Sequence, residues 1–141
     1  MLLALYSIRP NYSQKILGGQ KSVEFRRTQP NSSVQFIVIY ESSPTQKIVG
    51  LAEVTRVVSD SPQQIWDKYS LVGGISKVDF FEYFHGSSTA YAIEIVNVIS
   101  IEPISLEDAG LSPRAPQSFS YIYSQEVIDR LFKMSKSLKV S

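Results

Sequence analysis

Apolar residues fall along the chain in the short runs that are typical of β-strands. The run over residues 36–40 is β-branched and apolar on both faces, which indicates a strand inside a sheet. Residues 90–101 carry tyrosine and isoleucine at positions of one parity, with Glu94 and Ser100 at the other, as in a strand with two different faces. This pattern predicts five strands, over residues 1–8, 22–28, 36–40, 48–58 and 90–101.

Proline and capping residues predict four helices between and after these strands. Proline is tolerated in the first turn of a helix, where its missing N–H has no partner to lose, and glycine accepts the left-handed conformation that ends one. Serine before the first turn supplies an N-cap. We therefore expect helices from Pro10 to a stop at Gly18-Gly19, from Pro62 after Ser61, from Ser76 to Gly86, and from Ser124 onward.

Long strands with helices near both ends and in the middle indicate the α+β class rather than a repeating βαβ pattern. Gly50 interrupts the strand over residues 48–58, and such a glycine often marks a bulge or a bend at a barrel corner. We predict a small closed or nearly closed β-barrel decorated by helices. The length of 141 residues fits a single domain over residues 1–141.

Composition excludes several classes of site. The chain has no cysteine, which rules out disulfides, thiolate zinc sites and a cysteine nucleophile. His85 is the only histidine, so a multi-histidine metal site is impossible. No apolar run approaches the roughly 18 residues that a membrane span needs. We expect a cytoplasmic protein that has no membrane contact and needs no cofactor.

Charge is distributed unevenly, although the net charge is only +1. Residues 1–35 carry five bases against one acid, whereas residues 36–124 carry five bases against ten acids. A cationic N-terminal patch on an acidic body can bind an anion locally. It is too small for a protein that coats duplex DNA.

A group of short motifs lies in the N-terminal segment: S-I-R-P at residues 7–10, I-L-G-G-Q-K at 16–21 and E-F-R at 24–26. With these motifs the sequence resembles the ASCH family of the PUA-like superfamily, and segments 79–86 and 115–119 continue the resemblance in the expected order. The resemblance implies a PUA/ASCH-like barrel with a cleft. It also implies that the lysine and arginine of the motif face a nucleic acid or nucleotide.

Strand geometry gives an independent interpretation of this motif. Glu24 and Arg26 share one face of a strand, and Val23 and Phe25 share the other. If the apolar pair turns inward, the charged pair faces the open side, near Lys21 in the preceding turn. Two cations around one carboxylate suit a phosphate, a sugar or a base edge. The alternative is a salt bridge that only locks the strand to the turn.

Two further segments carry candidate binding residues. The aromatic side chains at 80, 81 and 84 form one stripe that suits core packing, and Tyr83 lies off this stripe and is the better candidate to stack on a base. Gln117 and Ser118 could hydrogen-bond a base or sugar, or equally could satisfy backbone groups. The candidate ligand-binding residues are Ser7, Lys21, Glu24, Arg26, Arg27, Tyr83, Gln117, Ser118 and Tyr121, with no assigned catalytic residue or metal ligand.

We predict a non-enzymatic module that binds RNA, single-stranded nucleic acid or a modified nucleotide, in translation-linked or transcriptional regulation. The alternative is a small hydrolase, acting either on RNA or on a modified nucleoside. A third possibility is a subunit that binds a protein partner.

The resemblance bears on the hydrolase in two ways. The family contains an amidohydrolase for acetylated cytidine whose lysine matches Lys21, but Glu24 stands where that enzyme has its threonine nucleophile. For RNA cleavage, which needs a metal or a base, Glu24 with Glu41 or Glu53 could contribute.

Overall fold

The structure, a computed structural model, describes residues 1–140, with side chains through Ser135. The chain forms six strands and four helices within these residues. In order they are β1 (Leu2–Ile8), α1 (Pro10–Leu17), β2 (Val23–Arg26), β3 (Val34–Glu41), β4 (Lys47–Asp60), α2 (Pro62–Tyr69), α3 (Lys77–Tyr83), β5 (Ala90–Ile104), β6 (Phe119–Ile122) and α4 (Gln125–Val140). The expected α+β class is confirmed.

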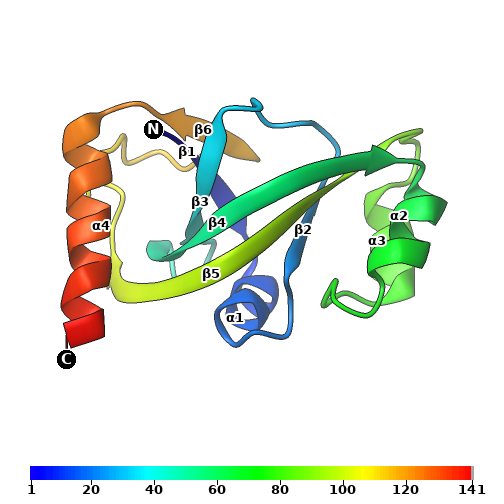
Figure 1. The fold of residues 1–141 in the computed structure, drawn as a ribbon, viewed down its shortest axis with the longest axis horizontal. Helices are drawn as coiled ribbons and strands as arrows, with labels where there is room; N and C mark the ends of the chain where they lie inside the picture. Colours follow the sequence, from blue (N-terminus) through cyan, green and yellow to red (C-terminus); the bar gives the residue numbers. More distant parts are fainter. Residues whose placement is uncertain (141) are drawn as a thin grey trace.

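The six strands form one mixed sheet in the order β2-β5-β4-β3-β1-β6. Strand β1 runs parallel to β3, and the other neighbouring pairs are antiparallel. Figure 1 shows α4 at one end of the molecule and α2 and α3 at the opposite end, with the long strands β4 and β5 between them. Strands β2 and β6 are the two edges of this order, so backbone pairing over residues 1–140 leaves the barrel open on one side.

The helix starts follow the predicted capping chemistry. Ser61 Oγ accepts a hydrogen bond from the Gln64 N–H at 3.2 Å, and Ser76 Oγ accepts one from the Asp79 N–H at 3.1 Å. The end of α3 was predicted less well, since the helix stops at Tyr83, short of Gly86. Within residues 1–140 no helix is long and apolar enough to cross a membrane.

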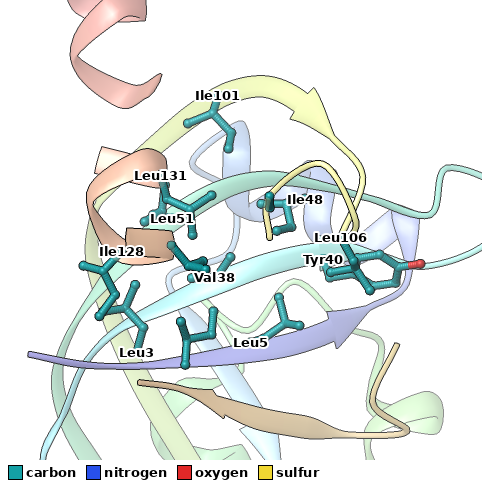
Figure 2. Close-up of a cluster of buried hydrophobic side chains, with 13 residues drawn as sticks. Leu3, Leu5, Val38, Tyr40, Ile48, Leu51, Ile101, Leu106, Ile128 and Leu131 are labelled. Atoms are coloured by element: carbon teal, nitrogen blue, oxygen red, sulfur yellow. The ribbon is translucent and has the colours of Figure 1, made fainter. Parts of the chain in front are cut away.

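Buried side chains form three clusters. In the first, which we call the α4 cluster, one face of the sheet packs against the last helix (Figure 2). The second, the barrel cluster, lies on the other face of β1 and β3, and the third, the lobe cluster, joins β2 to α2 and α3. Alternation explains the first two, because Leu3 and Leu5 of β1 enter the α4 cluster while Ala4 and Tyr6 enter the barrel cluster.

The regular parity of its sequence predicted one apolar face for β5, but the strand does not keep one. Ile93 and Ile95 belong to the barrel cluster, whereas Ile99 and Ile101 pack in or against the α4 cluster. The faces exchange at Asn97, which has a φ of 50°, next to a register shift against β4. An irregularity of this kind displaces the alternation, so one strand contributes to two cores.

Two predicted features of the middle strands also receive an explanation. The register of β4 shifts between Ile48 and Gly50, which confirms the irregularity expected at this glycine. A Cβ atom at Gly50 would lie 2.7 Å from the carbonyl oxygen of Ile99, closer than van der Waals contact allows. Strand β6, which is only four residues long, was not among the predicted strands, and it pairs with β1.

Helix α1 is held against the end of β3 by a buried carboxylate. Glu41 is 5% exposed and accepts hydrogen bonds from Ser13 Oγ, Thr45 Oγ1 and, at 2.7 Å, Gln14 Nε2. Burial alone would raise the pKa of Glu41, but these three hydrogen bonds outweigh it and lower the pKa below its usual value. The ionised carboxylate therefore stabilises the position of α1.

Replacing this carboxylate tests that role. Glu41→Gln should lower the free energy of unfolding by roughly 1–3 kcal/mol near neutral pH, because a charged acceptor is lost. The stabilisation is present above the usual glutamate pKa of about 4.3 and disappears as the pH falls through the lower pKa of the folded state. The difference from wild type in urea unfolding should therefore shrink below about pH 4.

The matched control for this experiment is Glu102→Gln, since Glu102 lies on β5 and is exposed. Glu102→Gln should unfold like the wild type both at neutral pH and below about pH 4. Equal stability of Glu41→Gln and wild type at neutral pH would contradict the role assigned to Glu41.

Candidate functional site

A cleft of about 690 Å³ opens where the N-terminal motif meets α3 and the segment before β6. Its volume lies in the range of small-ligand sites, about 300–1,000 Å³. Seven of the nine candidate residues line it: Ser7, Lys21, Glu24, Arg26, Arg27, Tyr83 and Gln117. Ser118 contacts Arg26 at its edge, and Tyr121 lies outside the lining, where its hydroxyl accepts a hydrogen bond from the Asn31 N–H at 2.9 Å.

The floor of the cleft is a buried ion pair. Arg26 Nε and Nη2 lie 3.0 and 2.7 Å from Glu24 Oε2, and the two residues are 8% and 6% exposed. Arg26 Nη2 also donates to the Ser7 carbonyl at 3.0 Å, and Nη1 donates to Ser118 Oγ at 3.3 Å. Arg26 on β2 thus reaches β1 and the segment before β6 across the open side of the barrel.

Tyr6 lies directly beneath this arginine. The Arg26 guanidinium carbon is 4.7 Å from the centroid of the Tyr6 ring, which also stacks on Phe119 at 5.1 Å. Burial raises the pKa of the Tyr6 hydroxyl above its ordinary value, so this group stays protonated. The Arg26 guanidinium thus donates to a carboxylate and lies over an aromatic ring, and both contacts are electrostatically favourable for a cation.

Lys21 is a buried amine beside the same carboxylate. It is 3% exposed, its Nζ donates to the Gly73 carbonyl at 2.6 Å, and Nζ lies 3.7 Å from Glu24 Oε1. The Nζ atom also lies 4.8 Å from the centroid of the Phe25 ring. Burial lowers the pKa of Lys21 below its usual value, with Glu24 acting in the opposite direction. The amine thus loses its proton more readily than a lysine on the surface.

The turn between α2 and α3 must contain glycine to lie on Lys21. A Cβ atom at Gly73 would lie 2.7 Å from the Phe25 ring. Gly74 has a φ of +62°, and a Cβ there would lie 2.9 Å from Lys21 Cβ. Sequence reasoning missed this contact, although the Gly73-Gly74 pair between two predicted helices was the available signal.

Arg27 forms the outer wall of the cleft with Tyr83. Its Nε and Nη2 donate to the Tyr83 carbonyl at 2.8 and 2.6 Å, and its guanidinium carbon lies 4.3 Å from the ring centroid. Strand β2 ends at Arg26, before the predicted limit at residue 28, because Arg27 turns toward α3. Arg27 remains exposed, unlike Lys21 and Arg26.

Of the remaining polar candidates, Ser7 is hydrogen-bonded within the protein and Gln117 is exposed to solvent. Ser7 Oγ donates to the Pro116 carbonyl at 2.7 Å, and the Ser7 N–H donates to the Ser118 carbonyl at 3.0 Å. These bonds attach β1 to the segment before β6. Gln117 is exposed and lines the cleft, so its amide is available to a ligand.

Charged residues that the sequence analysis had not selected also line the cleft. Arg9 lies within the S-I-R-P motif, and Asp79 and Glu82 lie one turn apart on α3. The lining therefore carries four basic and three acidic side chains. Glu41 and Glu53 lie outside it, and the described residues contain no group of three histidine, cysteine, aspartate or glutamate side chains that could hold a metal ion.

Comparisons with known proteins agree with this architecture. The chain is 29% identical over 129 residues to an ASCH domain-containing ribonuclease of Zymomonas mobilis, covering 87% of this chain and 86% of the relative. The crystal structure of ASCH from Zymomonas mobilis superposes with a TM-score of 0.84 at 27% identity, covering 94% of this chain and 95% of that one. The N-terminal domain of Staphylothermus marinus McrB shares the fold alone, with a TM-score of 0.56 at 10% identity over 94% of this chain and 92% of that one.

Another relative is much longer than this chain. The large ribosomal subunit protein uL22 of Ureaplasma parvum is 30% identical over 104 residues, which is 73% of this chain but only 33% of that protein. The model of the ASCH domain matches residues 7–105, which is more than half of the 141 residues and includes the whole motif from Ser7 to Arg27. The resemblance found in the sequence is confirmed, and the chain belongs to the ASCH domain family.

Proposed function

We propose that this protein is a ribonuclease-type hydrolase that holds single-stranded RNA in the cleft between β2 and α3. The observation that carries the proposal is the similarity over nearly the whole chain to a relative named as a ribonuclease, together with a cleft in which the buried Lys21 amine lies 3.7 Å from Glu24 and has a lowered pKa. Of the functions considered from sequence, the comparisons favour the hydrolase alternative over the non-enzymatic module.

The cleft suits a short stretch of one strand. Its exposed cations, Arg9 and Arg27, stand on the surface where they can neutralise phosphates. Single strands can also turn their bases toward aromatic and guanidinium planes, which a duplex hides. A volume of about 690 Å³ accommodates such a segment without requiring a surface that follows a double helix.

Lys21 is the group best placed to act as general base. In its neutral form the amine can accept the proton of the ribose 2′-hydroxyl, whose oxygen then attacks the adjacent phosphorus. The new 2′-oxygen–phosphorus bond forms as the bond from phosphorus to the 5′-oxygen breaks, and a water molecule protonates the leaving oxygen. Arg9, which is exposed and lines the cleft, would stabilise the charge that develops on the phosphoryl oxygens.

The amidohydrolase alternative finds less support. Glu24 occupies the position where the family's amidohydrolase has its hydroxyl nucleophile, and its carboxylate is committed to Arg26 at 2.7 Å. A carboxylate in that ion pair cannot replace the hydroxyl by the same route.

Incubation with labelled single-stranded RNA tests the proposal directly. Full-length RNA should disappear with time, and binding should weaken with salt at a log–log slope of roughly −2 to −3, as expected for three to four neutralised phosphates on a single strand. Gel electrophoresis follows cleavage, and fluorescence anisotropy follows binding. Binding with the expected salt slope but no cleavage would support the non-enzymatic module, and no binding at tens of micromolar would reject RNA as the ligand.

Lys21→Arg tests the role of the amine. Arginine keeps the positive charge but stays protonated, so the cleavage rate should fall about 10²–10⁴-fold while RNA affinity changes little. The wild-type rate should rise with pH as Lys21 loses its proton. Because burial lowers the pKa of Lys21, this rise should occur at a lower pH than the deprotonation of an exposed lysine.

The control is a lysine-to-arginine change at a neighbouring position that leaves Lys21 in place. Lys15→Arg serves, because the Lys15 amine donates at 3.0 Å to the next carbonyl of the same turn, that of Gly74, but lies outside the lining of the cleft. Cleavage by Lys21→Arg at the rate of Lys15→Arg would show that Lys21 is not the base.

A further inference from the structure

We propose that Arg27 and Tyr83 form a stacking platform for one base of the RNA, and that Asp79 and Glu82 select a base with an exocyclic amine, such as cytosine or adenine. This inference rests on the proposed function, since it names the class of nucleotide that the cleft receives. It assigns recognition of the base to the outer wall and leaves the reaction to the inner end of the cleft, around Lys21.

The guanidinium of Arg27 is held as a fixed plane. The Tyr83 ring covers one face at 4.3 Å, and two hydrogen bonds to the Tyr83 carbonyl fix its orientation. The Tyr83 ring is itself packed edge-on against Phe84, with centroids 4.8 Å apart and an interplanar angle of 77°. Because Arg27 is exposed and lines the cleft, the uncovered face of its guanidinium is available to a base.

The same hydrogen bonds argue against Arg27 as a simple phosphate clamp. A bidentate contact to phosphate uses two parallel N–H donors of the guanidinium. In Arg27 both Nε and Nη2, which form one such edge, already donate to the Tyr83 carbonyl. The Nε–Nη2 edge of Arg27 is therefore occupied, whereas the guanidinium face opposite Tyr83 remains available for stacking on a base.

The acidic pair on α3 supplies the preference among bases. Asp79 and Glu82 are both exposed and both line the cleft, three residues apart on the helix that carries Tyr83. An ionised carboxylate is a hydrogen-bond acceptor only. It can accept from the amino group of cytosine or adenine, whereas uracil presents an acceptor oxygen at the equivalent position.

Binding of short oligocytidylate and oligouridylate tests the platform. Both oligomers carry 2′-O-methyl riboses, so that they are not consumed, and fluorescence anisotropy gives the dissociation constants. Wild type should bind oligocytidylate at least about threefold more tightly, and replacing both Asp79 and Glu82 by alanine should remove this difference. Tyr83→Leu should weaken binding of oligocytidylate severalfold, because the Arg27 guanidinium loses the ring that covers its other face and holds its plane.

Three companion variants separate stacking from other effects. Tyr83→Phe keeps the ring and should restore binding. Arg27→Lys keeps the charge but not the plane, so it should weaken binding with an unchanged salt slope. Tyr123→Leu removes a tyrosine that is 74% exposed and lies outside the cleft, so it should bind like wild type.

The outcomes distinguish this inference from the proposed function. If wild type binds neither oligomer, the proposed function itself fails. If wild type binds but Arg27→Lys or Tyr83→Leu binds equally well, the platform is wrong, and Arg27→Lys keeps this test open should Tyr83→Leu fail to fold. Equal affinity of wild type for the two oligomers would overturn the selection by Asp79 and Glu82.

Discussion

The ion pair between Glu24 and Arg26 joins β2, one edge of the sheet, to β1 and the segment before β6 at the other edge, which backbone pairing does not connect. Burial of two charges is costly unless both are paired and hydrogen-bonded, and removal of one partner from such a pair costs about 3–5 kcal/mol. Arg26 meets this requirement with bonds to Glu24, to the Ser7 carbonyl on β1 and to Ser118. These contacts cross the gap between the two edges of the sheet and define the floor of the cleft. Lys21 depends on the same carboxylate, since its Nζ lies 3.7 Å from Glu24 Oε1.

The cations of the cleft divide into two kinds. Lys21 and Arg26 are buried and engaged by protein oxygens, so their donors are largely committed before any ligand arrives. Arg9 and Arg27 are exposed and line the cleft. Burial lowers the pKa of Lys21 relative to that of a surface amine. The basic residues of the first 35 positions are therefore divided between buried cations bound by protein oxygens and exposed cations.

The N-terminal half of the site could be predicted because it is local in sequence. The segment from Ser7 to Arg27 folds as strand, helix, turn and strand, so its motif residues meet through short-range geometry. Contacts with the distant segments could not be inferred as pairs, because the Gly73-Gly74 pair signals a tight turn but not its contact with Lys21, and no sequence pattern shows that Tyr83 meets Arg27. Alternation likewise predicted that residues 90–101 form a strand. It did not predict the exchange of faces at Asn97, because the isoleucines keep odd-numbered positions on both sides of this residue while the backbone turns them to opposite faces.

The position of β1 between β3 and the edge strand β6 has a consequence for folding during synthesis. One edge of β1 pairs with β3, but the other waits for β6, where Leu3 is opposite Ile122. Contacts so distant in sequence slow folding, and an apolar strand with a free edge invites pairing between chains in the meantime. Because Ser7 and Ser118 meet through this same pairing, the floor of the cleft can form only after the last strand has left the ribosome. The α4 cluster waits for the same C-terminal segments, since Leu3 and Leu5 pack with Ile128 of α4, so the sheet, its core and the cleft are completed together.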